Sequence, residues 1–144
     1  MAVLTKDGRT YTLGGSTLQL GRSLRHGSIS VGGATWPVEV TSFRKLAVSA
    51  GAFRLDPART VLPDGSAARW EATRKSAAVV RNDGARIDVR EEGFWRKRTT
   101  VEVTGVWAER DLVVLTACFA LLARQRRRRM ILIMAAANNG GGSG

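Results

Sequence analysis

Short segments in which apolar and polar residues alternate fill residues 1–105 of the chain. In residues 85–90, Ile87 and Val89 are predicted to face one way, and the charged residues between and beside them to face the other. Successive side chains of a β-strand point to opposite faces, so this alternation predicts a strand with one buried and one solvated face. Similar segments occur at residues 2–5, 10–13, 36–40, 43–48, 69–74, 76–81 and 95–104.

Turn-forming residues separate these segments at short intervals. Asp-Gly and Gly-Gly pairs supply the positive φ angles that tight hairpins need, so antiparallel strands are expected. Pro37 is expected at an edge or at the start of its strand, because proline cannot donate a ladder hydrogen bond. The predicted turns are at Asp7-Gly8, Gly14-Gly15, His26-Gly27, Gly32-Gly33, Pro63-Asp64-Gly65, Asn82-Asp83-Gly84 and Glu91-Glu92-Gly93.

The pattern changes after residue 106. Residues 112–123 carry no charge, Asp111 precedes them as a predicted N-cap, and an arginine run follows them. A helix that is apolar on every side must be surrounded by protein or by lipid. Twelve residues span about 18 Å, whereas a hydrocarbon core needs about 30 Å. This comparison favours a helix enclosed by the β-structure, with a short membrane anchor and an interfacial or dimerising helix as alternatives.

These patterns together predict a mainly β fold, in which an antiparallel barrel-like sheet encloses or packs on one apolar C-terminal α-helix. Residues 1–129 are expected to form a single β-rich domain, whose helix covers about 111–129. Residues 130–144 are expected to form an apolar patch followed by a flexible glycine-rich tail, because Asn138 to Gly144 contain no core-forming side chain.

Five segments in the second half of the chain are similar to the tubby C-terminal-like superfamily, which includes the LURP-one-related proteins and the phospholipid scramblases. The resemblance implies a barrel of about twelve strands closed around a central C-terminal helix, and it implies lipid-related function. The segments are Trp70-Glu71-Ala72-Thr73, Asn82-Asp83-Gly84, Phe94-Trp95-Arg96-Lys97-Arg98, Val101-Glu102-Val103-Thr104-Gly105 and Asp111 through Ala123.

Composition places the chain among basic single-domain proteins. Its 144 residues contain 23 Lys and Arg against 12 Asp and Glu, a net charge of +11. Without the five arginines of the run after residue 123, the remaining 18 cations still exceed the 12 carboxylates. A field of this sign favours polyanions, such as nucleic acid, anionic lipid headgroups or phosphorylated ligands. The N-terminus lacks a secretory pattern, and a lone cysteine is typical of a reducing compartment, so a cytoplasmic location is expected.

Candidate catalytic and metal-binding residues are few. One Cys and one His exclude a disulfide framework, a Cys-based zinc site and a multi-His metal cluster. His26 and the Glu91-Glu92 pair are interpreted as turn residues, and Cys118 as an inert core residue. Neither Gly-Gly-Ser-Thr nor Gly-Gly-Ala-Thr has the spacing of a phosphate loop. We therefore expect no enzyme activity and no cofactor.

Two basic clusters remain as candidate binding sites. Arg96, Lys97 and Arg98 follow two aromatic residues, and alternation predicts Arg96 and Arg98 on one exposed face. The second cluster comprises Arg124, Arg126, Arg127, Arg128 and Arg129, next to the apolar residues 130–134, a combination that suits an anionic membrane surface.

The prediction is a non-enzymatic binding domain for anionic lipid headgroups or phosphorylated partners at the inner membrane surface. Two alternatives stay open. One is a cytoplasmic β domain anchored in the membrane by residues 112–123. The other is a non-specific nucleic-acid-binding protein, because aromatic residues interleaved with basic ones stack single strands.

Overall fold

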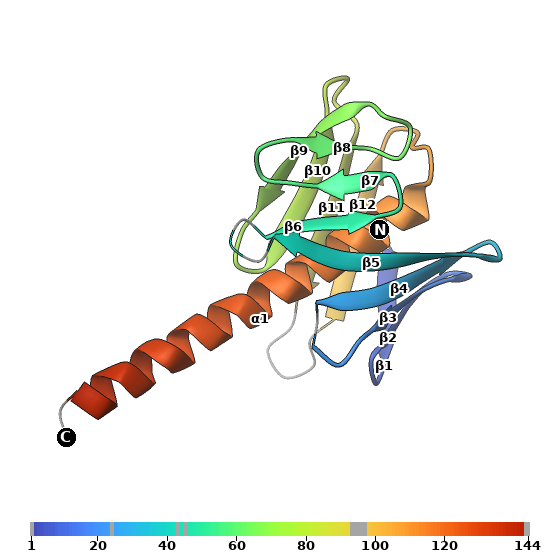
Figure 1. Ribbon diagram of the computed structural model, residues 1–144. Helices are drawn as coiled ribbons and strands as arrows, with labels where there is room; N and C mark the ends of the chain where they lie inside the picture. The colour runs from blue at the N-terminus through green and yellow to red at the C-terminus, as the bar shows by residue number, and fades with distance from the viewer. Residues whose placement is uncertain (1, 24, 43, 45, 93–97, 143–144) are drawn as a thin grey trace.

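The computed structural model describes residues 2–23, 25–42, 44, 46–92 and 98–142, with the side chains of residues 130, 132 and 134–142 outside the description. Over these residues the chain forms strands followed by one long helix (Figure 1). The elements are β1 (Ala2–Asp7), β2 (Thr10–Leu13), β3 (Ser16–Leu20), β4 (His26–Val31), β5 (Ala34–Ser42), β6 (Ala47–Ala50), β7 (Phe53–Leu55), β8 (Thr60–Val61), β9 (Ala67–Ala72), β10 (Ser76–Arg81), β11 (Arg86–Glu92), β12 (Arg98–Thr104) and α1 (Arg110–Gly142).

The strands of the described residues form a closed antiparallel barrel of twelve, in which each strand pairs with its neighbours in the chain. Tight turns make this order possible: in the β4–β5 hairpin, Gly32 and Gly33 have φ angles of 56° and 85°, as a two-residue turn requires. The barrel closes where Ala2 of β1 pairs with Val101 of β12. The predicted mainly β, barrel-like fold is confirmed.

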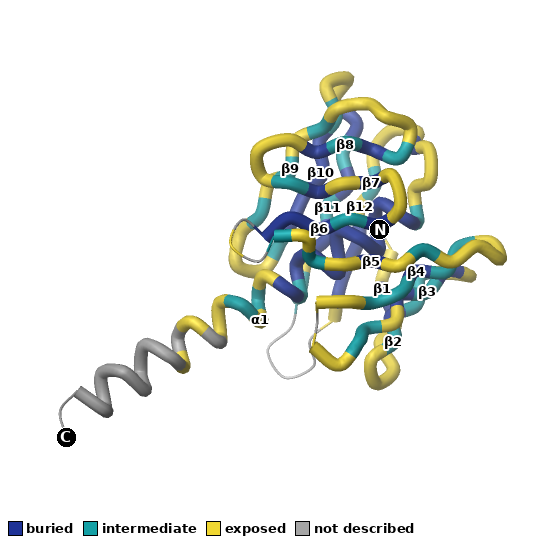
Figure 2. The backbone as a smooth tube through the Cα atoms, viewed as in Figure 1, coloured by how far each residue is buried: buried dark blue, intermediate teal, exposed yellow. Residues whose placement is uncertain are grey.

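The first part of α1 runs through the barrel as its core. The side chains of Leu112 to Leu121 are all buried, and so is Ala123. The helix contacts β3, β4, β5, β6, β7, β10 and β11, so strands lie on several sides of it. Figure 2 shows this part of the helix in the buried class, inside the wall of strands. The hypothesis of a helix enclosed by the β-structure is confirmed, and it explains why residues 112–123 are apolar on every side.

The barrel wall presents its apolar residues inward as the alternation predicts. Ile87 and Val89 are fully buried, whereas Arg90 is exposed and Arg86 and Asp88 are partly exposed. Pro37 pairs with Ser28 of β4, while the pairing of β5 with β6 begins one residue later. Proline therefore occupies a position with a strand on one side, which agrees with the predicted edge position.

Polar contacts fix the start of the helix. Asp111 was predicted as the N-cap, but it lies inside the first turn, and Glu109 precedes the helix with a φ of 55°. Ser16 donates a hydrogen bond of 2.6 Å to the Asp111 carboxylate and ties the helix to β3. The acidic side chain also suits the positive end of the helix dipole. The predicted N-cap is therefore wrong by position, although the residue still stabilises this end.

Two predicted local structures are wrong. The segment 43–48 is not one strand, because Leu46 has a φ of 55° and β6 begins only at Ala47; Phe43 itself lies outside the described residues. His26-Gly27 begins β4 instead of forming a turn. Gly27 is needed in the strand because an added Cβ would lie 2.7 Å from the Gln19 carbonyl oxygen and 3.2 Å from the Val38 side chain.

The ends of two elements also differ from the sequence prediction. Glu91 and Glu92 are strand residues that pair with Thr99 and Arg98 of β12, not turn residues. The helix ends at Gly142, whereas an end near residue 129 was predicted. Met, Leu and Ala between residues 130 and 137 have high helix propensity, which favours continuation beyond the arginine run. We call residues 124–142 the α1 extension; it projects away from the barrel (Figure 1).

Candidate functional site

A pocket of about 490 Å³ lies where α1 leaves the barrel, and we call it the exit pocket. Its walls come from β1, β2, the turn between β9 and β10, the end of β11, the start of β12 and one face of α1. This volume is in the range of small-molecule sites. The lining residues are Leu4, Lys6, Tyr11, Arg74, Lys75, Glu91, Arg98, Thr99, Leu122, Gln125, Arg128 and Arg129.

The lining of the exit pocket is strongly cationic. Among the described residues, six of its side chains are Lys or Arg and one is a carboxylate, which gives these residues a net charge of +5. Arg98 approaches Glu92 with an N–O distance of 3.8 Å. The other cations form no ion pair within the described part of the chain: Lys6, Arg74, Lys75, Arg128 and Arg129. Charges of one sign in a concave site concentrate counter-ions there.

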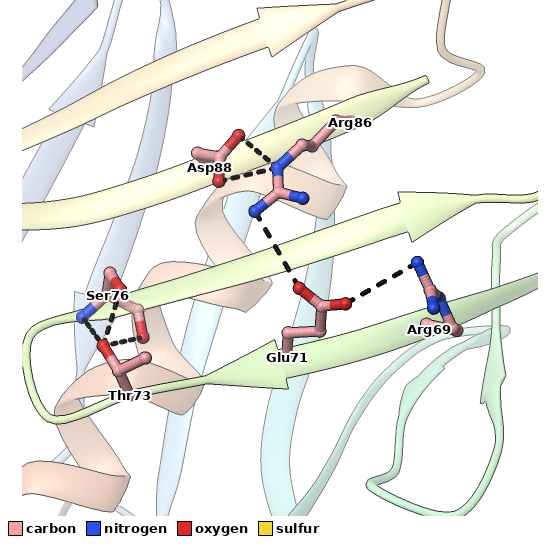
Figure 3. A network of polar contacts seen from close by, with 6 residues as sticks. All are labelled: Arg69, Glu71, Thr73, Ser76, Arg86 and Asp88. Carbon is pink, nitrogen blue, oxygen red and sulfur yellow. Dashed lines mark hydrogen bonds and ion pairs between the residues drawn. The ribbon is translucent and has the colours of Figure 1, made fainter. Parts of the chain in front are cut away.

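One group of charges on the outer face of β9 and β11 is instead paired (Figure 3). The Arg86 Nε atom donates to both carboxylate oxygens of Asp88, at 2.9 and 3.0 Å, and this hydrogen bonding raises the pKa of Arg86. Glu71 lies 3.9 Å from the same guanidinium and 3.6 Å from that of Arg69. The cations of the exit pocket therefore differ from those of this wall in having few carboxylate partners.

A tight turn carries two of the pocket cations. Arg74 and Lys75 lie between Thr73 and Ser76, whose hydroxyl oxygens are 2.6 Å apart. Figure 3 shows the Thr73 and Ser76 side chains turned toward each other. The Thr73 backbone N–H also donates to the Ser76 carbonyl at 2.7 Å. On the helix side, the Gln125 amide donates to the Arg74 carbonyl at 3.3 Å. These contacts hold the turn against the helix where it leaves the barrel.

Tyr11, which lines the exit pocket, and Cys118, which is buried in the barrel core, both hold their protons. Burial, with smaller contributions from Cys118 and Glu91, raises the pKa of Tyr11 to about 12. Burial also raises the pKa of the Cys118 thiol to about 12. Neither group is a nucleophile near neutral pH, because the reactive forms are phenolate and thiolate. The Lys6 ammonium lies 5.7 Å from the centre of the Tyr11 ring, a favourable cation–π distance.

A second hollow of about 330 Å³ adjoins the exit pocket along the helix, and we call it the helix groove. It shares three residues with the exit pocket and adds one apolar side chain to a basic lining. Its lining residues are Arg74, Arg124, Gln125, Arg127, Arg128 and Ile131. The two hollows therefore form one basic surface around the exit of α1.

The structure brings the two predicted basic clusters together only in part. Arg98, Arg128 and Arg129 line the exit pocket, and Arg124 and Arg127 line the helix groove. Arg126 is exposed and lines neither hollow. The other two predicted residues, Arg96 and Lys97, lie outside the described residues.

Sequence reasoning missed Lys6, Arg74 and Lys75. Arg74 ends one predicted strand and Lys75 precedes the next, so this basic pair was only a weak indication of a binding site. No sequence feature indicated Lys6. These residues lie beside the arginines of β12 and α1 only because of the fold. β1 pairs with β12, and the β9–β10 turn contacts α1.

Within the described ranges, no three His, Cys, Asp or Glu side chains are grouped closely enough to hold a metal ion. In the part of the chain that the structure covers, no helix is both long enough and apolar enough for a bilayer span. Comparisons of the chain with protein-family models, curated proteins and solved structures found no match.

Proposed function

We propose that this chain is a non-enzymatic binding domain whose exit pocket takes phosphate-bearing anions. The ligand is a lipid headgroup at the inner membrane surface or a phosphorylated partner, and both present the same chemistry. One observation carries the proposal: in the part of the chain that the structure describes, six cationic side chains from β1, β12, α1 and the β9–β10 turn line a pocket of about 490 Å³ together with one carboxylate. Arginine forks bind phosphate oxygens in pairs, and lysines add compact charge.

The pocket cations have the properties of a binding site more than of a salt-bridge network. Five of the six form no ion pair with the described residues, so an anion would not have to displace a carboxylate from them. The Thr73–Ser76 turn and the Gln125 contact hold the backbone of Arg74 in place before any ligand arrives. Such preorganisation lowers the entropy cost of binding.

The absence of catalysis is part of the proposal. Tyr11 and Cys118 hold their protons up to strongly alkaline pH because both are buried. Glu91 and Glu92 are successive strand residues, so they point to opposite faces and do not form an acid–base pair. These features support binding without bond making or breaking.

The closed barrel around a C-terminal helix supports membership of the tubby C-terminal-like superfamily, which we include in the proposal. This is the architecture that the similarity of the second half of the chain implies. Because that superfamily includes the phospholipid scramblases, the similarity favours a lipid headgroup as the source of the phosphate and a cytoplasmic location at the membrane.

A binding titration of the full chain tests the proposal. The probes are inorganic pyrophosphate, phosphatidylcholine vesicles with and without phosphatidylserine, and random single-stranded DNA. The pocket variant K75A/R128A removes two lining cations. The matched control R54A/R69A removes two exposed arginines that lie outside the pocket lining. Each charged hydrogen bond contributes about 1.5–3 kcal/mol, so the pocket variant should lose at least about tenfold in affinity.

The control variant should lose less than about threefold, because it changes only the long-range field. Equal losses in the two variants would contradict the pocket as the binding site. Binding to DNA alone, without pyrophosphate or vesicle binding, would favour the nucleic-acid alternative. Vesicle binding without pyrophosphate binding would assign the source to lipid, and the reverse would assign it to a soluble phosphorylated partner.

A further inference from the structure

The lining of the exit pocket is divided into two layers that differ in exposure and in charge. Among the described lining residues, all the Lys and Arg side chains are exposed, so the cations surround the mouth of the pocket. The other described lining residues are buried or half-buried and form the inner wall: Leu4, Tyr11, Glu91, Thr99, Leu122 and Gln125. Charge therefore changes with depth, from cations at the mouth to one carboxylate among neutral side chains inside.

Glu91 belongs to the inward face of β11. It continues the alternation of Ile87 and Val89, which are fully buried in the barrel. Its partner across the sheet is Thr99 of β12, which is 8% exposed and lines the same pocket. The Glu91 charge also contributes to the raised pKa of Tyr11, so its field reaches the buried side of the pocket. The carboxylate is therefore part of the inner wall and not of the mouth.

An inner carboxylate selects the part of a ligand that lies beyond its phosphate. The exposed cations at the mouth attract the phosphate of any ester. Farther in, a second anionic group of the ligand would meet Glu91, and like charges brought together weaken binding strongly. Hydroxyl groups instead donate hydrogen bonds to a carboxylate, and each carboxylate oxygen accepts more than one. The inner wall therefore favours a neutral, hydroxyl-bearing group over an anionic one.

We propose that the exit pocket takes a phosphate ester of a neutral, hydroxyl-bearing alcohol, with the phosphate at the cationic mouth and the hydroxyl groups directed to Glu91. Glu91 is then a specificity-determining residue, which disfavours an alcohol that carries a carboxylate or a second phosphate. This inference rests on the proposed function, because the mouth must bind the phosphate. The phosphoglycerol headgroup of a lipid and free glycerol 3-phosphate present the same chemistry.

Two soluble esters that differ in one group test the selection. Glycerol 3-phosphate has a hydroxymethyl group where 3-phosphoglycerate has a carboxylate. Net charge alone favours 3-phosphoglycerate, because cations outnumber the one carboxylate in the described lining. We expect the opposite order: in calorimetric titrations of the full chain, glycerol 3-phosphate should bind about tenfold more tightly. Tighter binding of 3-phosphoglycerate to the unchanged chain would overturn the proposal.

Glu91→Gln removes the charge and keeps the shape of the side chain. This variant should lose the preference and bind 3-phosphoglycerate at least as tightly as glycerol 3-phosphate. The matched control is Glu102→Gln, which removes the same charge from an exposed residue of β12 outside the described pocket lining, and it should keep the tenfold preference. An unchanged preference in Glu91→Gln, or an equal loss in Glu102→Gln, would overturn the role of Glu91.

Pyrophosphate shows whether the variants are folded and whether the mouth still binds phosphate. It lies among the exposed cations, so Glu91→Gln and Glu102→Gln should bind it no more weakly than the unchanged chain does. Loss of pyrophosphate binding in Glu91→Gln would contradict the division of the pocket into a cationic mouth and a selective inner wall.

Vesicles identify the source of the ester. Phosphatidylglycerol carries a hydroxyl-bearing alcohol on its phosphate, whereas phosphatidic acid carries none. Tighter binding of the full chain to phosphatidylcholine vesicles with phosphatidylglycerol than to those with phosphatidic acid would support a lipid headgroup. Selective binding of glycerol 3-phosphate without this preference between vesicles would support a soluble ester.

The two proposals fail in different ways. Pyrophosphate binding that needs Lys75 and Arg128, together with a preference for 3-phosphoglycerate, would overturn the role of Glu91 and leave the proposed function standing. Absence of pyrophosphate binding in the unchanged chain, with neither ester bound, would overturn both.

Discussion

Truncation of Phe119 to alanine tests whether the barrel is built around its helix. The Phe119 side chain is fully buried and faces Gly27 in β4. Replacement of a buried Phe by Ala usually lowers the free energy of unfolding by about 3–5 kcal/mol. The loss is larger when the surroundings cannot collapse into the cavity. A hydrogen-bonded closed wall relaxes little, so we expect Phe119→Ala to lower the free energy of unfolding by about 4–5 kcal/mol.

Urea unfolding followed by tryptophan fluorescence measures this change. With a slope of about 2 kcal/mol per molar urea, the unfolding midpoint should fall by about 2 M. Phe119→Leu retains most of the volume and should cost about 1 kcal/mol. Val106→Ala, at a side chain that is 89% exposed, should change stability by less than about 0.5 kcal/mol.

The order of the three variants matters more than any single value. A loss of less than about 1 kcal/mol in the free energy of unfolding of Phe119→Ala would contradict a helix enclosed by the barrel. Removal of a buried aromatic ring usually costs about 3–5 kcal/mol. Equal losses for Phe119→Ala and Val106→Ala would also contradict it, because one is buried and the other exposed.

Three further outcomes follow from the packing of the barrel. Gly27→Ala places a Cβ 2.7 Å from the Gln19 carbonyl oxygen and should lower stability by about 1–3 kcal/mol in the same assay. Burial raises the pKa of Tyr11 from 10.0 and of Cys118 from 9.0 to about 12, so the folded state holds both protons more tightly. The contribution of these two groups to the free energy of unfolding should therefore be constant between about pH 6 and 8 and fall from about pH 8 to 12; a rise over the alkaline range would contradict it. Maleimide should label Cys118 slowly in native protein at neutral pH and rapidly in urea, and equal rates would show that the thiol is not enclosed.

The enclosed helix was predictable from the composition and the length of one segment. Residues 112–123 lack charge, and their length is too short for a hydrocarbon core, so a protein enclosure was the favoured outcome. Alternation at Ile87 and Val89 predicted strand faces for the same reason, since side-chain direction in a strand depends on position alone.

Local features without a residue signature were not predictable. Alternation predicted one strand over residues 43–48, but the positive φ of Leu46 interrupts it. Leucine rarely adopts such a conformation, so the sequence does not indicate the interruption. Gly27 resembles a turn glycine in sequence, yet the Gln19 carbonyl oxygen of β3 and the Val38 side chain of β5 leave no room for a Cβ, at 2.7 and 3.2 Å. Those contacts depend on how the three strands pair, which the residue itself does not reveal.

The candidate site was predictable in its chemistry but not in its membership. Arg98 and Arg128 were identified from basic runs, whereas Lys6, Arg74 and Lys75 join them only because β1 pairs with β12 and the β9–β10 turn contacts the helix. Closure of the barrel depends on strand pairing across almost the whole chain, and a single sequence does not encode that pairing in any short motif.

A nuclear magnetic resonance titration of the full chain with inorganic pyrophosphate shows directly whether the exit pocket binds anions. We expect saturable shifts in the backbone amide signals of Lys6, Lys75, Arg98 and Arg128, which surround the exit pocket. The amide of Arg69, on the ion-paired outer wall, should not move. Shifts spread evenly over all exposed arginines, or none at the pocket, would contradict a built anion site where the helix leaves the barrel.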